Sequence, residues 1–279
     1  MIKIVTDTAT GLTPAMAARH DIELVPLVVM FGTETLRDGV DITNEVFLQR
    51  LKMAKEFPTT SQPPVGDFVA AFKKHLEVGD EVLCITLSSL LSGTYNSAET
   101  AKQQLGGDKI TLIDCKTLAT AQTMIVLEAA RMVRDGRSMA DIVKRLDRMI
   151  AGSHLNFVLD TLEYLVKGGR VGNVAGLLGT LLQTKPILTI RDGRLVPLER
   201  IRTRRKAMAR MREIVDAAVK GQPGAMIGVA HTGIHAEAET LAREFRDKYH
   251  LADCLVLDIP PAVSAHAGPG AIAIGYYVE

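Results

Sequence analysis

The stretch VLCITLSSLLSGTYN, residues 82–96, decides how the rest of this 279-residue chain is arranged. Its apolar start, Val82 to Leu87, predicts a buried strand, and a helical pattern begins at about Tyr95 after a loop rich in hydroxyls. The first N–H groups of a helix have no internal partner, and the helix dipole favours an anion at that end. The loop therefore predicts either a helix cap made by Ser92 or a binding place for a carboxylate or phosphate.

Strands and helices alternate along the first half of the chain. Short connections between alternating strands and helices are typical of a parallel sheet wrapped by helices. Ligands in such sheets sit at the ends of strands, and Asp7 stands at the end of the first one, so it is a candidate supporting residue. We expect strands at 2–5, 23–30, 82–87 and 110–114, and helices at 14–19, 43–52, 65–77, 95–105, 118–134 and 139–150.

The pattern changes at about Ser153. A strand, a short helix and a segment rich in glycine and leucine at 170–182 come first, followed by a hairpin with its turn at Asp192-Gly193. The Gly/Leu segment is expected to pack closely or to line an apolar channel. We therefore expect two α/β domains: 1–152, with a parallel, Rossmann-like sheet, and 153–279, with a mixed sheet.

Composition narrows the classes of protein. With 47% hydrophobic and 23% charged residues the chain is typical of a folded globular protein, and its net charge of +1 gives no overall preference for nucleic acid or membranes. Cys84, Cys115 and Cys254 lie far apart in apolar runs, so we expect reduced, buried thiols and no metal site. The chain opens on a strand and has no apolar run of about 20 residues, which predicts a cytoplasmic protein without a membrane-spanning segment.

Two further segments carry side chains that suit an anion. Thr60 and Ser61 stand just before two prolines that open the expected helix at 65–77, so their hydroxyls are predicted to cap it and are also candidate ligand donors. His266 lies in the segment SAHAGPG, 264–270. A histidine in such a Gly/Pro loop is not expected to be needed for core packing. Imidazole can donate to an anion in either protonation state.

Several chemistries lack their motifs, because the chain contains no GxGxxG, GxxxxGK[ST], HExxH or GxSxG. A catalytic triad is recognised by geometry and not by sequence order. A hydrolase or acyltransferase is therefore an alternative function, with a triad formed by Ser92, His266 and either Asp7 or Asp114.

A basic cluster between Arg191 and Arg212 contains nine basic residues and two acids. Nucleic-acid binding needs such a footprint, usually with aromatic residues interleaved, and this cluster has none. A solvated helix face, or a docking surface for an acidic partner protein, is the favoured interpretation over a DNA-binding regulator.

Taken together and in order, these stretches resemble the DegV family of bacterial fatty acid-binding proteins. No single segment is specific for the family. The ordered set is highly specific for it, and it runs over nearly the whole chain. Thr8 stands where the family often has serine, and Pro64 stands where serine usually follows Gln-Pro. The matching segments are TDT at 6–8, TSQP at 60–63, SLLSGTY at 89–95, LEYLVKGGR at 162–170, IRTRRK at 201–206 and HAGPG at 266–270.

The resemblance implies a non-catalytic lipid-binding protein that holds a long-chain fatty acid in a tunnel between its two domains, without a cofactor. Some members of the family resemble the binding subunit of a bacterial fatty acid kinase, whose separate ATP-binding subunit phosphorylates the carboxylate. The expected partners are therefore the fatty acid and such a kinase subunit, with no nucleic acid. The implied carboxylate-binding residues are Thr60, Ser61, Ser92, Gly93 and His266, with Asp7, Thr94, Arg170 and Gly268 in support.

Overall fold

The computed structural model describes residues 1–170 and 184–279. Most of the Gly/Leu-rich segment lies outside these residues. The first half contains β1 (Ile2–Asp7), a 3-10 turn η1 (Thr8–Thr10), α1 (Pro14–Arg19), β2 (Ile22–Val25), β3 (Val28–Phe31), β4 (Glu34–Arg37), α2 (Asn44–Met53), β5 (Thr59–Ser61), α3 (Val65–Glu77), β6 (Glu81–Thr86), α4 (Thr94–Gln104), β7 (Ile110–Asp114), α5 (Ala119–Arg134) and α6 (Met139–Gly152). The second half contains β8 (Ser153–Val158), α7 (Glu163–Lys167), β9 (Ile187–Arg191), β10 (Arg194–Glu199), α8 (Arg204–Val219), β11 (Met226–His231), α9 (His235–Tyr249), β12 (Leu255–Asp258), α10 (Pro261–Ala267) and β13 (Ile272–Tyr277).

The strands form a parallel sheet and a mixed sheet, as the sequence predicts. The first has the order β2-β1-β6-β7 and is parallel throughout. The second has the order β10-β9-β8-β13-β11-β12, with a single parallel pair between β11 and β12. All strands of the parallel sheet precede residue 115, and all strands of the mixed sheet follow residue 152. The domain boundary at 152 stays a prediction, because the two sheets also share packing.

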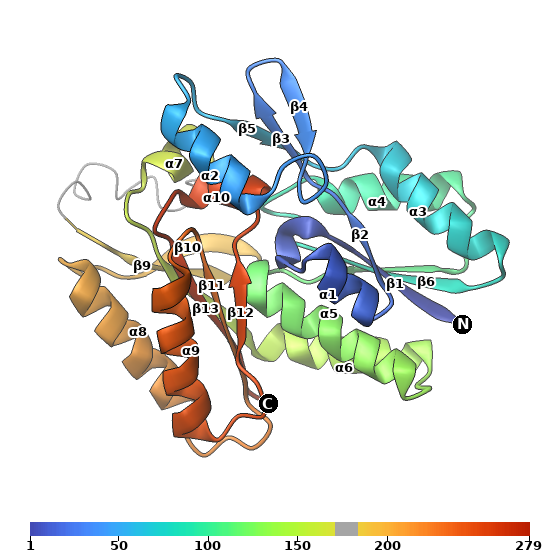
Figure 1. Ribbon diagram of the computed structural model, residues 1–279. Coiled ribbons are helices and arrows are strands. Elements are labelled where there is room, and N and C mark those ends of the chain that lie inside the picture. Colours follow the sequence, from blue (N-terminus) through green and yellow to red (C-terminus); the bar gives the residue numbers. More distant parts are fainter. Residues whose placement is uncertain (171–183) are drawn as a thin grey trace.

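A third, small sheet corrects the sequence analysis. The single strand expected over 23–30 is two strands, β2 and β3, that belong to different sheets. Pro26 lies between them and has no N–H to donate to a ladder, which favours a break at this point. The antiparallel sheet β4-β3-β5 that results projects from the body of the molecule (Figure 1).

Helix α5 joins the two larger sheets. It packs against β1 of the parallel sheet and against β8, β11 and β13 of the mixed one, and it lies between the two halves in Figure 1. Close approach is possible because β13 carries a glycine at the contact. A Cβ atom on Gly275 would lie 2.5 Å from Thr120 Oγ1 and 2.9 Å from the Ala121 nitrogen. The missing side chain of Gly275 thus sets the distance between α5 and the mixed sheet.

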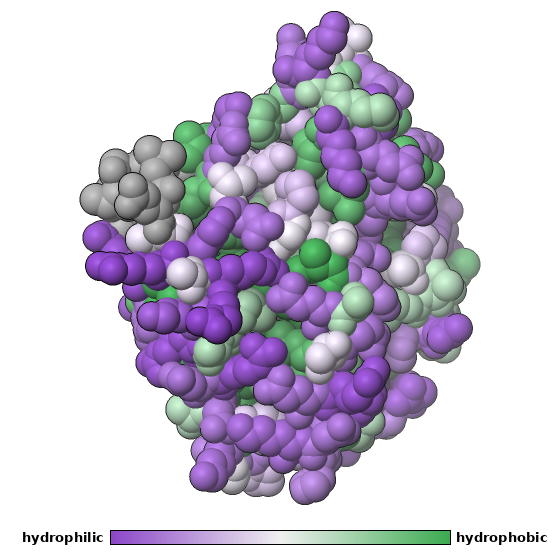
Figure 2. Space-filling model, turned by 60° about the vertical axis from the view of Figure 1, so that its left-hand side comes forward, coloured by the Kyte–Doolittle hydropathy of each residue, from purple (hydrophilic) through white to green (hydrophobic). Residues whose placement is uncertain are grey.

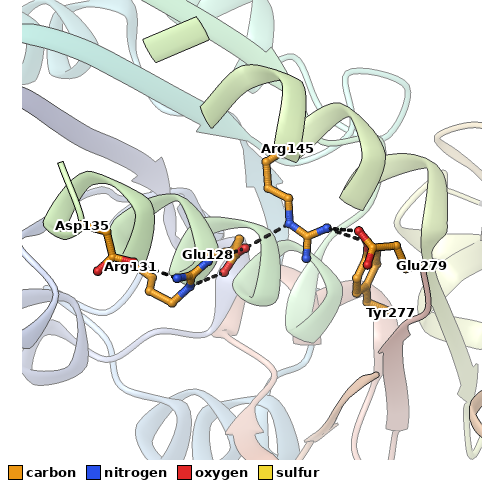
Figure 3. A network of polar contacts seen from close by, with 6 residues as sticks. All are labelled: Glu128, Arg131, Asp135, Arg145, Tyr277 and Glu279. Carbon is orange, nitrogen blue, oxygen red and sulfur yellow. Dashed lines mark hydrogen bonds and ion pairs between the residues drawn. The ribbon is translucent and has the colours of Figure 1, made fainter. Parts of the chain in front are cut away.

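A polar network stabilises the same junction (Figure 3). Arg145 on α6 donates to Glu128 on α5 at 3.0 Å, and it reaches across to the Tyr277 hydroxyl at 3.0 Å and to Glu279 at 2.7 Å. Arg131 also binds Glu128, and this ion pair lowers the pKa of the Glu128 carboxyl. The buried carboxylate is therefore compensated on two sides, as a buried charge must be.

We expect Gly275→Ala to lower the free energy of unfolding by about 1–3 kcal/mol, because the added methyl group forces α5 away from β13. Urea denaturation measures the change. Gly66→Ala is the matched control, because Gly66 lies in α3 with open space at its Cβ position. This variant should have a free energy of unfolding about 0.5–1 kcal/mol higher than the wild type. Equal stability of Gly275→Ala and the wild type would show that this contact yields without cost.

Candidate functional site

The candidate site is an apolar pocket enclosed by elements from both halves of the chain. The space between its walls is about 720 Å³ when the part open to solvent is included. Its apolar walls come from the loop after β6, the start of α5, β8, β9, β10, α7 and α10. The wall residues include Leu87, Leu118, Phe157, Ile190, Leu195 and Val263.

The polar side chains of the described pocket wall are Thr60, Ser61, Ser92, Arg170 and His266. They come from β5, the loop before α4, the segment after α7, and α10. All five were singled out in the sequence, and the fold brings them to one pocket although up to 206 positions separate them. An apolar chamber with a few polar groups can bury an amphipathic ligand and fix its orientation.

Thr60 and His266 contact one another directly. Thr60 Oγ1 lies 2.7 Å from His266 Nε2. The predicted cap role of Thr60 and Ser61 is wrong: they belong to β5, which pairs with β3, and α3 begins after Pro64 without a side-chain cap. The predicted loop around His266 is also wrong, since His266 lies in the last turn of α10. A short strand and a short helix therefore hold this pair, and both are more rigid than loops.

The electrostatic environment keeps His266 neutral. Burial, together with the nearby positive charge of Arg170, lowers the pKa of His266 to about 4. Its Nδ1 atom has no hydrogen-bond partner within the described parts of the chain. A Cβ atom on Gly168, the residue that ends α7, would overlap this nitrogen, so the glycine leaves the space that the ring occupies.

Arg170 gives the pocket a positive charge. Its side chain is half-buried, and its guanidinium donates to the Gly168 carbonyl at 2.7 Å. Burial lowers the pKa of Arg170 from its ordinary value, yet the guanidinium stays charged at neutral pH. Within residues 1–170 and 184–279 it forms no ion pair with an acid. With neutral His266 beside it, the polar part of the pocket carries net positive charge and suits an anion.

Ser92 forms the third side of the polar part, and the predicted residue Gly93 follows it without lining the pocket. The Ser92 hydroxyl lies 2.8 Å from Thr94 Oγ1 and accepts weakly from the Thr94 backbone nitrogen at 3.4 Å. Helix α4 starts at Thr94, one residue earlier than expected, with Gly93 at its N-cap position. A Cβ atom on Gly93 would lie 2.6 Å from the Gln62 amide nitrogen, so this glycine lets the β5 segment approach.

The remaining predicted residues lie outside the pocket wall. Asp7 is fully buried behind it and accepts from the Leu87 nitrogen at 2.8 Å and the Ala9 nitrogen at 3.0 Å. Burial raises the pKa of Asp7 to about 6. Gly268, with φ of 75°, packs against the ring of Tyr164. Asp7 and Thr94 thus contact the pocket residues Leu87 and Ser92, whereas the supporting role of Gly268 stays a prediction.

Sequence reasoning missed Asp38. It stands after β4 beside Gly39, where the pair signals only a turn, yet its side chain is 1% exposed. Burial, with the charge of Asp7 as a smaller contribution, raises the pKa of Asp38 to about 7. An acid in a turn motif is ordinarily solvated, so only the packing of α10 over this turn reveals the residue.

The geometry lacks the relay that a serine hydrolase needs. His266 Nε2 contacts Thr60, while the Ser92 hydroxyl contacts Thr94. Asp114 binds Ser89 at 2.6 Å and not the histidine. A general base must reach its nucleophile, and a third group must orient the base. Among the described residues neither contact is made.

The basic cluster is partly neutralised by ion pairs. Arg204 binds Asp160 and Glu237, Arg210 binds Glu199 and Glu213, and Arg212 binds Glu244. The face drawn in Figure 2 is largely hydrophilic, and its apolar residues show as separate small patches. These pairs disfavour a phosphate-binding footprint across the cluster.

The described residues contain no group of three or more His, Cys, Asp and Glu side chains placed to hold a metal ion. Cys84, Cys115 and Cys254 are buried free thiols, as expected. No helix in the described part of the chain has the length and apolar character that a membrane crossing requires.

Fold and site together define an α/β protein with two large sheets and one small sheet, whose apolar pocket has a positively charged polar part. The family model described as "Uncharacterised protein, DegV family" matches residues 1–279. A DegV domain-containing protein of Halalkalibacterium halodurans is 36% identical over 279 residues, which cover 100% of this chain and 99% of the relative. The chain belongs to the DegV family.

Solved structures share the fold over the whole length. A DegV family protein from Thermus thermophilus, described for its fatty acid binding, superposes with a TM-score of 0.93 at 31% identity, covering 100% of this chain and 99% of the other. A stearic acid-binding protein from Eubacterium ventriosum superposes with a TM-score of 0.91 at 29% identity, covering 100% and 98%. These neighbours are fatty acid-binding proteins.

The depressed pKa of His266 predicts a pH-dependent contribution to stability. The ring has a pKa of about 4 in the fold and 6.5 as its ordinary value, so its contribution is fully present above pH 6.5 and is lost as the pH falls toward 4. Between pH 7.5 and 4.5 the wild type should lose about 2–3 kcal/mol more than His266→Asn. Urea unfolding at both pH values measures this difference.

The exposed His20→Asn variant is the control for that comparison, and it should follow the wild type. Asp7 and Asp38 have raised pKa values and act in the opposite direction, but they are common to all three proteins. A His266→Asn variant with the same pH slope as the wild type would contradict a neutral, partly buried ring.

Proposed function

We propose that this protein binds a long-chain fatty acid, with the acyl chain in the apolar pocket and the carboxylate at Thr60, Ser92, His266 and Arg170. The observation that carries the proposal is the unbalanced positive charge of Arg170 beside hydroxyls and a neutral imidazole, at one part of an otherwise apolar chamber. The fatty acid-binding neighbours support the same ligand class.

The energetics divide between the two parts of the ligand. Burial of about a dozen methylenes contributes on the order of 10 kcal/mol gross, at roughly 0.8 kcal/mol per CH₂. A carboxylate taken out of water must be hydrogen-bonded, because an unpaired buried charge is far more costly. The hydroxyls of Thr60 and Ser92 can donate to it, and Arg170 can neutralise it. The acyl chain of the ligand then supplies the affinity, and the polar groups of the pocket fix the orientation of the ligand.

Orientation has a functional consequence. A carboxylate held among groups that are only partly buried, rather than deep among leucines, is accessible to a second protein. We propose that the chain presents the carboxylate to a separate ATP-dependent kinase subunit, which forms the acyl phosphate. The sequence supports this division of labour, because it has no recognisable nucleotide-phosphate loop. The chain itself would need no cofactor.

Native mass spectrometry of the purified protein tests the ligand. We expect a mass increment of one long-chain fatty acid, identified by extraction and lipid analysis. Ser92→Ala and Thr60→Val should each weaken retention by about 10- to 100-fold, because each removes a hydrogen bond to a charged group. Thr100→Val is the matched control, since its hydroxyl bonds only within α4 on an exposed face.

A protein that purifies empty and takes up no added fatty acid would overturn the proposal. In that case hydrolysis of short-chain nitrophenyl esters, abolished in Ser92→Ala, would support the hydrolase alternative instead. We expect no ester turnover above the buffer rate.

Reconstitution tests the kinase partnership. Fatty acid-loaded protein, ATP and an ATP-binding fatty acid kinase subunit should together form acyl phosphate, trapped as the hydroxamate. The loaded protein with ATP alone should form none. Acyl phosphate from the chain alone, or none from the complete mixture with several kinase subunits, would contradict a presenting role without affecting the ligand assignment.

A further inference from the structure

Asp38 is buried beside the pocket without lining it, and the proposed function leaves it unused. Its Oδ2 atom accepts from the backbone nitrogen of Ala262 at 3.1 Å, across 224 positions of sequence. Ala262 is the second residue of α10, after Pro261, which has no N–H. The helix has no cap from its own flanking side chains, so Asp38 satisfies its first free donor.

The position of that contact matters for His266. Residues four apart lie on the same side of a helix, one turn above another. His266 stands four residues after Ala262, in the last turn of this seven-residue helix. Because α10 is so short, the Asp38 contact at its first turn lies one helical turn from His266.

Asp38 is also tied to the other partner of the pair. Its backbone nitrogen donates to the Leu27 carbonyl at 2.8 Å. The Thr8 hydroxyl accepts from the Leu27 nitrogen at 3.0 Å, and it also lowers the pKa of the nearby Asp38 carboxyl. Leu27 leads directly into β3, where Val29 pairs with Thr60. Asp38 thus connects to both partners of the Thr60–His266 hydrogen bond, through its carboxyl group to α10 and through its backbone nitrogen to Leu27.

A carboxylate here has a cost that an apolar residue would avoid. The side chain is 1% exposed, and the second buried acid, Asp7, adds repulsion. Groups that face it are Thr8 from η1, the Ala262 nitrogen from α10, and Asp7 from β1. A buried acid that only filled space would be replaced at little loss by leucine.

We infer that Asp38 is a positioning residue for the carboxylate end of the pocket, which sets the spacing between the Thr60 hydroxyl and the His266 ring by anchoring α10 to the β2–β3 connection. It does not line the pocket. The inference rests on the proposed function for its ligand, but the geometry it describes exists in the empty protein.

The first test reads that geometry without any ligand. In Asp38→Ala the ¹⁵N NMR shift of His266 Nε2 should move toward that of a ring without a hydrogen bond, as in Thr60→Val. Asp38→Asn should keep the wild-type shift, because its amide oxygen still accepts from Ala262. A wild-type shift in Asp38→Ala would overturn the inference.

The second test compares hexadecanoic acid with hexadecanol. Asp38→Ala should weaken binding of the acid by at least 10-fold and binding of the alcohol by less than 3-fold, whereas general destabilisation would weaken both alike. In a His266→Ala background the effect of Asp38→Ala on the acid should fall below 3-fold, because the residue acts through the histidine. Asp41→Asn, in the same turn but exposed, should bind like the wild type.

The outcomes separate the two ideas. Failure of the wild type to bind either compound removes the proposed function and leaves the NMR result standing. Equal losses for acid and alcohol, or an undiminished effect in the His266→Ala background, overturn the positioning role alone. If Asp38→Ala does not fold, Asp38→Ser takes its place, since the shorter hydroxyl does not span to Ala262.

Discussion

The hydrogen bond between Thr60 and His266 is the constraint on which the pocket depends. It joins β5 to α10, two short elements that have little stability of their own, across 206 positions of sequence. β5 is held by its pairing with β3, and α10 packs over that small sheet. The pocket is therefore a product of the completed fold, and its polar part exists only when both ends of the chain have assembled.

Buried acids are the second means by which the structure holds the pocket. Asp7 binds the first N–H of the hydroxyl-rich loop, and Asp38 binds the first free N–H of α10. Both have raised pKa values because burial disfavours their charge. Arg170, which lines the pocket, is also unfavourable for stability, because it is a half-buried cation without an acid partner in the described chain. The cost of these three charges is offset by the apolar packing on either side of them.

The chain belongs to the DegV family, and its structural neighbours from Thermus thermophilus and Eubacterium ventriosum are fatty acid-binding proteins. The residues of this chain explain how such a ligand would be oriented. Its contacts also separate a binding site from a hydrolytic one: the imidazole contacts a threonine, the candidate nucleophile contacts another threonine, and Asp114 contacts Ser89. Identical residue types with different partners would have defined a different chemistry.

The sequence by itself determined the two kinds of sheet and the strand–loop–helix unit at 82–96, because hydrophobic period and short motifs are local signals. It also singled out Thr60, Ser61, Ser92 and His266, which line the pocket, whereas Arg170 was named through the family resemblance. It misplaced Thr60 and Ser61 as helix caps, put His266 in a loop and overlooked Asp38. Each of these depends on contacts between segments far apart in the chain. Pairing with β3 makes the segment of Thr60 and Ser61 a strand instead of a helix cap. Packing of α10 buries Asp38, although its sequence signals only an exposed turn. Only tertiary structure decides such outcomes, since burial is not a property of any segment taken alone.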